Sequence, residues 1–203
     1  MKILRHTNFS FLLLLCVVTL FSCTTAQLYT YDIRLERPTP SQNLQFENDT
    51  ISISFAFNYD YIDFELYNKL DEAIKVNWKD LSVSIDGETQ RVIPSNAYFV
   101  GFPGKEPSIM VAPRSKIKDI IRTSDKAGMW DSTSSIQKAT LNTFPDRDYG
   151  IPSERRRIQA LKGKKIIIYL PYYLKNVYYS KTFEFIIADI QAKYTPEISG
   201  PAS

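Results

Sequence analysis

Cysteine, histidine and glycine are scarce in this 203-residue sequence, which has two cysteines, one histidine and seven glycines. His6, Cys16 and Cys23 all lie in the first 23 residues, so the rest of the chain has no thiol and no imidazole. This excludes disulfide bonds, thiolate or histidine zinc sites, cysteine nucleophiles and Ser-His-Asp triads from that part. No GxGxxG or GxxxxGKS/T phosphate-binding loop occurs either. The sequence therefore predicts no enzyme activity, no metal site and no cofactor.

Neither sign of charge is in large excess, because 25 Lys and Arg residues stand against 22 Asp and Glu residues. Lys2 and Arg5 belong to the amino-terminal segment described next, and without them 23 basic residues remain against the same 22 acidic ones. Nucleic-acid-binding domains usually carry a pronounced basic excess. The balance therefore argues against a nucleic-acid partner.

The amino-terminal segment combines a basic start with a short apolar run. Lys2 and Arg5 precede residues 9–22, which read FSFLLLLCVVTLFS and carry no charge. A helix of these 14 residues would be about 21 Å long, shorter than the ~30 Å hydrocarbon core of a bilayer. This arrangement is typical of an export signal rather than of a permanent transmembrane helix.

The apolar run ends in Leu20-Phe21-Ser22-Cys23. This segment resembles the lipobox of bacterial lipoproteins, which has an aliphatic residue three positions before the cysteine and a small residue directly before it. The resemblance implies that residues 1–22 are a signal peptide and that the thiol of Cys23 carries a diacylglycerol, a palmitate-type lipid anchor. Residues 23–49 would then be the acylated cysteine, a tether and an N-terminal strand. The alternative is cleavage after Ala26 by an ordinary signal peptidase, which would release a protein without lipid.

A lipid anchor would place the protein in the cell envelope, since two or three acyl chains make detachment from a bilayer negligible. Thr24 occupies the position at which some lipoproteins carry an aspartate that retains them in the inner membrane. No acidic run of the kind associated with surface display follows. We therefore expect an outer-membrane location facing the periplasm, with the membrane and an envelope protein or glycan as partners.

Apolar and polar residues alternate along much of the remaining chain, as in strands that bury one face. Asp86-Gly87 is a strong signal for a hairpin turn. Few helix signals occur, so the pattern predicts an all-β fold, an antiparallel β-sandwich in one domain over residues 50–203. The expected strands are residues 28–35, 51–57, 62–67, 74–78, 81–85, 90–93, 108–112, 116–122, 164–170 and 182–190.

Residues 123–163 interrupt the strand pattern. Loops longer than ~12–15 residues usually have a function or contain elements of their own. Ser153 and Glu154, followed by the apolar Ile158 and Leu161, predict one short helix that Ser153 caps. We expect the rest of this insertion to be irregular and to be held in place by aromatic side chains such as Tyr149.

Three further features carry a resemblance: Leu66-Tyr67-Asn68-Lys69 followed by residues 74–78, the Asp86-Gly87 turn, and Gly163-Lys164-Lys165 before a late strand. In spacing and strand order they look like the small immunoglobulin-like β-sandwich domains of uncharacterised bacterial lipoproteins. The resemblance covers residues 50–122 and 163–192. Antibody-type domains have a cysteine pair around the tryptophan, which this chain lacks, so the resemblance implies an architecture and no reaction.

Two acidic residues are candidates for carboxylate catalysis. Asp63 and Glu65 lie two positions apart on one expected strand, with Asp60 nearby, and glycosidases use carboxylate pairs roughly 5–10 Å apart. The alternative is a solvated outer face, because catalytic acids usually need burial to raise their pKa. We regard a glycan-cleaving enzyme as the third choice of function.

Two clusters are candidates for binding. Tyr172, Tyr173, Tyr178 and Tyr179 flank a short turn and could stack on sugars or contact a protein, or could instead divide between the core and an edge strand. Arg155, Arg156 and Arg157 could contact anionic lipid or glycan, or could be a solvated face. Asp49-Thr50-Ile51 and Asp131-Ser132-Thr133 resemble an O-glycosylation motif of exported bacterial proteins, with Thr50 and Ser132 as acceptors.

The sequence thus favours a lipid-anchored envelope lipoprotein with a non-catalytic structural or interaction role. A carbohydrate-binding module that uses the tyrosines is the second choice. The binding partner, the oligomeric state and the role of residues 123–163 stay open at this point.

Overall fold

The computed structural model describes residues 26–58, 61–94, 108–124 and 144–193. The expected signal peptide, Cys23 and Ser132 lie outside these ranges. The described chain forms eleven strands, one α-helix and one short 3-10 turn. The strands are β1 (Leu28–Arg37), β2 (Gln45–Glu47), β3 (Ile51–Phe57), β4 (Ile62–Asn68), β5 (Ile74–Val76), β6 (Ser82–Ile85), β7 (Glu88–Pro94), β8 (Ile109–Val111), β9 (Lys116–Ser124), β10 (Lys165–Leu174) and β11 (Val177–Lys193). The helices are α3 (Pro152–Gln159) and the 3-10 turn η1 (Trp78–Asp80).

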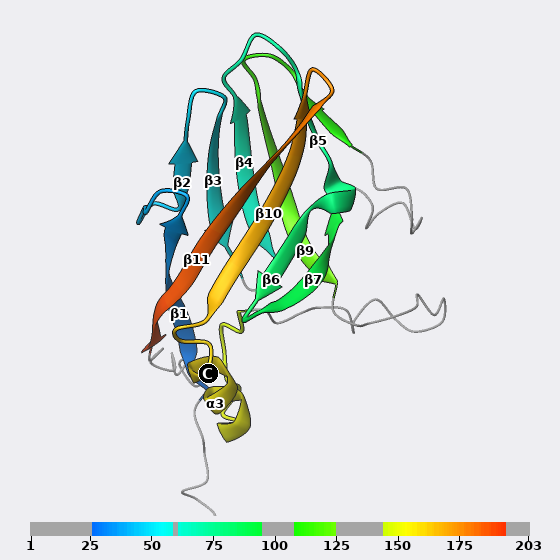
Figure 1. Cartoon of the computed structure of the whole chain (residues 1–203). Coiled ribbons are helices and arrows are strands. Elements are labelled where there is room, and N and C mark those ends of the chain that lie inside the picture. Colours follow the sequence, from blue (N-terminus) through cyan, green and yellow to red (C-terminus); the bar gives the residue numbers. More distant parts are fainter. Residues whose placement is uncertain (1–25, 59–60, 95–107, 125–143, 194–203) are drawn as a thin grey trace, which may run out of the picture.

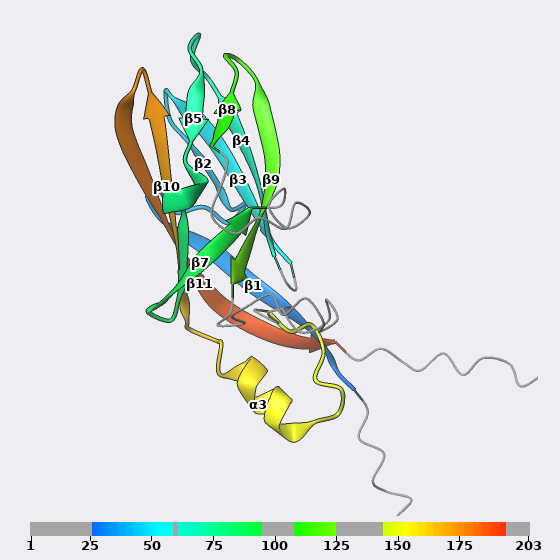
Figure 2. The same cartoon turned by 90° about the vertical axis from the view of Figure 1, so that its right-hand side faces the viewer.

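The strands pair in one antiparallel path, in the order β1-β11-β10-β6-β7-β9-β4-β3-β2, with β5 beside β10 and β8 beside β5. The path doubles back on itself at β7 and β9, so two sheets face each other (Figures 1 and 2). The expected all-β antiparallel sandwich is confirmed. Its insertion contains the expected short helix, α3.

Aromatic side chains fill the space between the two sheets. Phe55 of β3 contacts Phe183 and Phe185 of β11 from the opposite sheet, with ring centroids 5.0 and 5.1 Å apart. Phe46 of β2 also meets Phe183, at 5.6 Å, and Trp78 packs against Phe64. These rings and the alternating aliphatic residues of every long strand make one contiguous core.

Several strand bounds follow directly from the local sequence. β3 spans the expected residues 51–57, and its isoleucines and Phe55 are buried while its serines are half-buried. Asp86 and Gly87 form the turn between β6 and β7, both with positive φ (53° and 85°), which a two-residue hairpin of this kind requires. Asn77 ends β5 early, because its side chain accepts a hydrogen bond from the N–H of Lys79 and starts η1. Trp78 therefore lies in η1 and not in a strand.

The sandwich has two distinct ends, which Figures 1 and 2 show at opposite extremes of the molecule. The first, which we call the helix pole, holds α3 and the beginning of β1. The second, the hairpin pole, holds the turn between β10 and β11. β10 alone has ten residues, so the two poles are about 30 Å apart at ~3.3 Å per strand residue.

Candidate functional site

The β10–β11 hairpin brings the four predicted tyrosines together at the hairpin pole. Lys175 and Asn176 form its two-residue turn, with φ of 49° and 64°. Tyr172 pairs with Tyr179 and Tyr173 pairs with Tyr178 across the two strands. The rings of each pair are in contact: the first pair is stacked at 5.6 Å, and the second is edge-to-face at 5.4 Å.

The two tyrosine pairs lie on different faces of the sheet. Tyr172 is buried, with 4% of its surface exposed, and lies on the core side of β10. Tyr179 stacks against it at the rim and stays 43% exposed. Tyr173 is half-buried and Tyr178 is 45% exposed on the outer face. The sequence-based expectation of an interaction cluster therefore reduces to three accessible rings, because burial removes Tyr172 from the surface.

Tyr169, a third tyrosine on the outer face, holds the ring of Tyr178 in place. The hydroxyl oxygens of Tyr169 and Tyr178 are 2.6 Å apart. This hydrogen bond raises the pKa of Tyr178 to about 12. The pKa of Tyr169 is lowered, because its hydroxyl group takes part in side-chain hydrogen bonds with Ser180, which has the larger effect, and with Tyr178. Tyr169 has no signal in the sequence, since it lies in a run of consecutive apolar residues that does not show which of them point outward.

The outer face continues from these tyrosines across two further strands. Tyr178, Tyr173, Lys75 and Met110 are successive partners in the register of β11, β10, β5 and β8. Met110 is 60% exposed. The row combines two tyrosine rings and an exposed methionine, residue types that are enriched at interaction surfaces, with one lysine.

Asp63 and Glu65, the candidate catalytic carboxylates, lie away from the tyrosines on the outer face of β4. A shallow hollow of about 560 Å³ lies over β3, β4 and β9 and includes Asp63, Glu65 and Lys118 in its lining. Glu65 forms ion pairs with Lys118 and Lys116, at 2.8 and 3.0 Å, and these ammonium groups lower its pKa. A general acid needs the opposite shift. Asp63 accepts a hydrogen bond from the amide of Asn58 at 2.7 Å.

The three consecutive arginines lie on α3 at the helix pole. Arg155 pairs with the buried Asp148 at 2.9 Å, and Arg157 pairs with Glu154 at 3.5 Å. Arg156 is exposed. Ser153 is not the helix cap, since α3 begins with Pro152 after Ile151, which has no capping side chain. The arginine cluster thus serves partly to hold the helix pole together.

Asp148 is the centre of that pole and was not found from the sequence. Its side chain is fully buried and accepts four hydrogen bonds: from the N–H groups of Gln27 and Gly150 at 2.9 Å, from Arg155 at 2.9 Å and from the hydroxyl of Tyr29 at 3.0 Å. Burial alone would raise the pKa of Asp148, but these donors outweigh it and hold the pKa well below its usual range. The network joins the start of β1 to the loop before α3. We call it the Asp148 latch.

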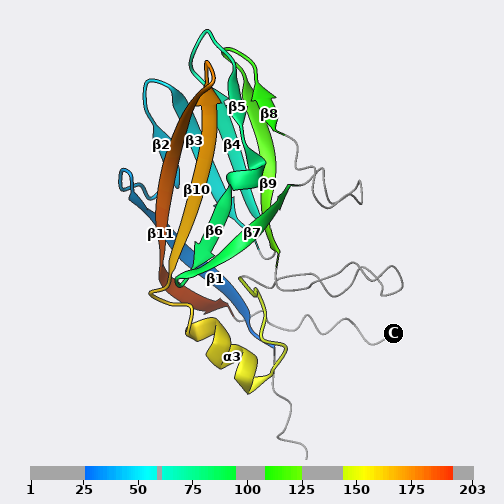
Figure 3. The same cartoon turned by 45° about the vertical axis from the view of Figure 1, so that its right-hand side comes forward.

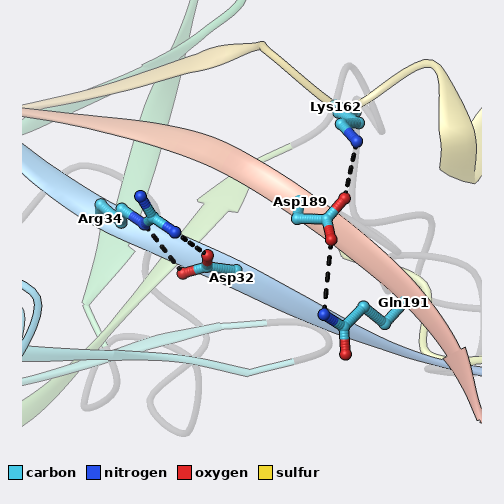
Figure 4. Close-up of polar contacts among 5 residues, drawn as sticks. All are labelled: Asp32, Arg34, Lys162, Asp189 and Gln191. Carbon is cyan, nitrogen blue, oxygen red and sulfur yellow. Dashed lines mark hydrogen bonds and ion pairs between the residues drawn. The ribbon is translucent and has the colours of Figure 1, made fainter.

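Charged side chains also surround the β1–β11 ladder near this pole (Figure 4). Asp32 and Asp189 are directly opposite each other in the register, where like charges destabilise a sheet. Arg34 bonds to Asp32, and Lys162 bonds to Asp189 at 2.7 Å. The hydrogen bond from Lys162 lowers the pKa of Asp189. Lys162, which follows α3, therefore offsets the negative charge of Asp189 opposite Asp32.

Thr50, one of the two predicted glycosylation acceptors, lies in the turn before β3. Its N–H donates to the side chain of Asn48 at 3.0 Å, and its carbonyl accepts from Lys69. The residue is half-buried. Thr50 therefore takes part in a tight turn whose backbone is already hydrogen-bonded.

Within the described ranges, no group of three or more His, Cys, Asp or Glu side chains converges as a metal site would require. A helix long and apolar enough to cross a membrane is also not found among those residues. Comparisons with protein-family models, with curated proteins and with solved structures found no match to this chain.

Proposed function

We propose that the protein is a lipid-anchored lipoprotein of the cell envelope with a non-catalytic interaction role. In this proposal the hairpin pole is the part that contacts a partner. The observation that carries the anchor is the segment Leu20-Phe21-Ser22-Cys23 after an apolar run. Cys23 would carry the lipid, and the outer membrane, facing the periplasm, is the proposed location. The immunoglobulin-like resemblance contributes only the architecture to this proposal.

The Asp148 latch supports this proposal by giving the anchor a defined point of attachment. Gln27 bonds to Asp148, and Cys23 precedes it by only four residues. Four extended residues reach at most about 14 Å. An anchor at Cys23 would therefore keep the helix pole close to the bilayer. The hairpin pole, with its exposed tyrosines, would then point away from the membrane, where a partner can reach it.

Arg156, one of the exposed arginines of α3, fits this orientation. Arg156 lies on the helix pole, and the neighbouring Tyr149 and Ile151 are 61% and 48% exposed. Tyrosine and aliphatic side chains beside cations are typical of surfaces next to lipid headgroups. The anion contact predicted for the arginine triplet is thus proposed for Arg156 at the membrane.

Carbohydrate binding is the second candidate, and the outward rings of Tyr173 and Tyr178 favour it. These rings meet edge-to-face, so they offer no single flat platform. A glycan array with the full chain tests this candidate: binding that a Tyr178→Ala variant loses supports it, and a signal at background rejects it.

Metabolic labelling with a fatty acid tests the anchor. Cys23→Ala is expected to lose the label and to leave the membrane fraction, since it removes the acylated thiol. Cys16→Ala is the matched control, because it changes the other cysteine of the same segment and should keep the label. A labelled Cys23→Ala protein, or a native chain that begins at Gln27 without acyl mass, would refute the anchor.

A further inference from the structure

Strand β11 has neighbouring strands on both sides only from residue 184 to residue 186, because β10 alone pairs with the part before these residues and β1 alone with the part after them. β10 pairs with β11 from Val177 to Ile186, whereas β1 pairs with it only from Glu184 to Lys193. Among the described residues, therefore, no strand lies on the β1 side of residues 177–183. Figures 1 and 3 show β1 beside the lower part of β11, with the β10–β11 hairpin extending beyond it.

The register determines which backbone groups face the vacant side. A two-residue turn makes Leu174 and Val177 a hydrogen-bonded pair, and such pairs alternate along an antiparallel ladder. Ile187 fits the same alternation, because its N–H donates to Lys164 and its carbonyl accepts from Gly163, both next to β10. Odd-numbered residues of β11 thus bond toward β10. The N–H and C=O groups of Tyr178, Ser180 and Thr182 face the vacant side, and we call these three residues the open edge.

The open edge continues the established β1–β11 ladder in a straight line. The last pair of that ladder joins Arg37 to Glu184. Pro38 follows, and a proline has no N–H with which to extend the pairing. The chain turns toward β2 at this point, so the next positions along β11 are left without a strand of β1.

Several other edges of the described sandwich carry the protection that natural sheets use against added strands. Contacts with Arg147 and Ser41 cover the two ends of the outer side of β1. β9 presents Lys116 and Lys118 along its edge, and β2 and β8 have only three residues each. The segment 177–183, which carries the open edge, is longer than these two short strands and has neither a proline nor a bulge.

The side chains around the open edge are mostly uncharged and partly aromatic, and Lys181 is the one cation within residues 177–183. Tyr178 lies on its outer face and Tyr179 at its inner rim, and Val177 is 53% exposed. Lys181 lies over the ring of Phe46, at 5.5 Å, on the core side. The edge therefore offers backbone groups that no described strand pairs with, beside the rings of Tyr178 and Tyr179, and this is the chemistry that recognises an extended peptide.

We propose that the open edge is a strand-addition site, which binds an extended peptide segment of a partner protein antiparallel to β11. The segment takes the positions that β1 leaves at Pro38, and apolar side chains at alternate positions pack on Tyr178. This inference rests on the proposed function, because it names the kind of partner that an envelope-anchored interaction domain would hold.

Proline at the open edge provides a selective test. Ser180→Pro removes an N–H that points to the vacant side of β11 and leaves the backbone hydrogen bonds to β10 in place. The fold should therefore be kept. Ser180→Ala is the matched control, since it retains that N–H. The probe is a displayed library of random linear peptides, selected on the full chain purified in detergent, and selected peptides are then measured against all three proteins.

The expected result is that selected peptides protect the amides of Tyr178, Ser180 and Thr182 from hydrogen exchange. They should bind Ser180→Pro at least tenfold more weakly than the native chain and bind Ser180→Ala within twofold. Equal binding to Ser180→Pro, protection elsewhere, or no selected peptide would overturn the proposal. Self-association that Ser180→Pro abolishes would overturn it in favour of a second copy as the occupant. Circular dichroism confirms that each variant is folded. The fatty-acid labelling of Cys23 is measured separately, so a wrong anchor assignment is distinguished from a wrong strand-addition site.

Discussion

Removal of the Asp148 carboxylate should strongly destabilise the protein. In Asp148→Ala, the four donors at Gln27, Gly150, Arg155 and Tyr29 lose their acceptor at a site with no solvent exposure. Breaking a buried ionic hydrogen-bond network by removing one partner costs about 3–5 kcal/mol. For a domain of this size, each kcal/mol lowers the Tm by roughly 2–4 °C, so the Tm should fall by roughly 10 °C.

Urea unfolding followed by circular dichroism measures this change. Asp146→Ala is the matched control, since Asp146 is an exposed aspartate two residues away. Its effect should stay within about 0.5 kcal/mol, as for most surface substitutions. If Asp148→Ala were as stable as Asp146→Ala, the latch would not hold the helix pole, and the reasoning that assigns this role to it would be refuted.

Two further predictions concern the pH dependence of the latch and the aromatic core. The folded-state pKa of Asp148 is lowered, so its stabilisation is complete above the unfolded pKa of about 4 and is lost as the pH falls below that value. The difference in unfolding free energy between the native chain and Asp148→Asn should therefore shrink from pH 7 toward pH 2 in urea titrations, and a constant difference would contradict the assignment. Phe183→Ala should cost about 3–5 kcal/mol, because the ring is fully buried between Phe46 and Phe55. Phe183→Leu should cost less than about 1.5 kcal/mol, and equal effects of the two variants in thermal unfolding would argue against this packing.

Alternation and turn chemistry were enough to predict most of the sandwich. β3 and β4 show strict alternation with one buried face, and the Asp86-Gly87 turn has the backbone conformation that its residue types favour. These features depend on residues that are close in sequence. A period of two and a short turn are visible without knowledge of the partner strand.

The extent of the β10–β11 hairpin was harder to predict because of Pro171, which normally marks the end of a strand. In the structure, Pro171 lies between the part of β10 that pairs with β6 and the part that pairs with β5. Its missing N–H therefore interrupts no ladder, while its carbonyl accepts from Asn77. The tyrosines were placed near a tip from the sequence, but their division between two faces follows from the register, which the sequence alone does not reveal.

The latch had no sequence signal at all. Asp148 lies in an irregular segment, and its four donors come from positions as far as 121 residues away. Periodicity and local motifs describe neighbours along the chain, so they do not identify a carboxylate two of whose donors, Gln27 and Tyr29, lie 121 and 119 residues earlier. A buried charge of this kind is recognised only when the fold brings its donors together.

The latch also determines how the domain would respond to mechanical force. The described chain enters at the helix pole, and β1 runs from there along β11 through ten residues. A pull on the polypeptide at residue 26 against a load held at the hairpin pole acts along the axis of β1, so it loads the hydrogen bonds of that ladder in shear rather than opening them one after another. The bonds at Gln27 would carry the load first, and the paired strands behind them would resist as a unit.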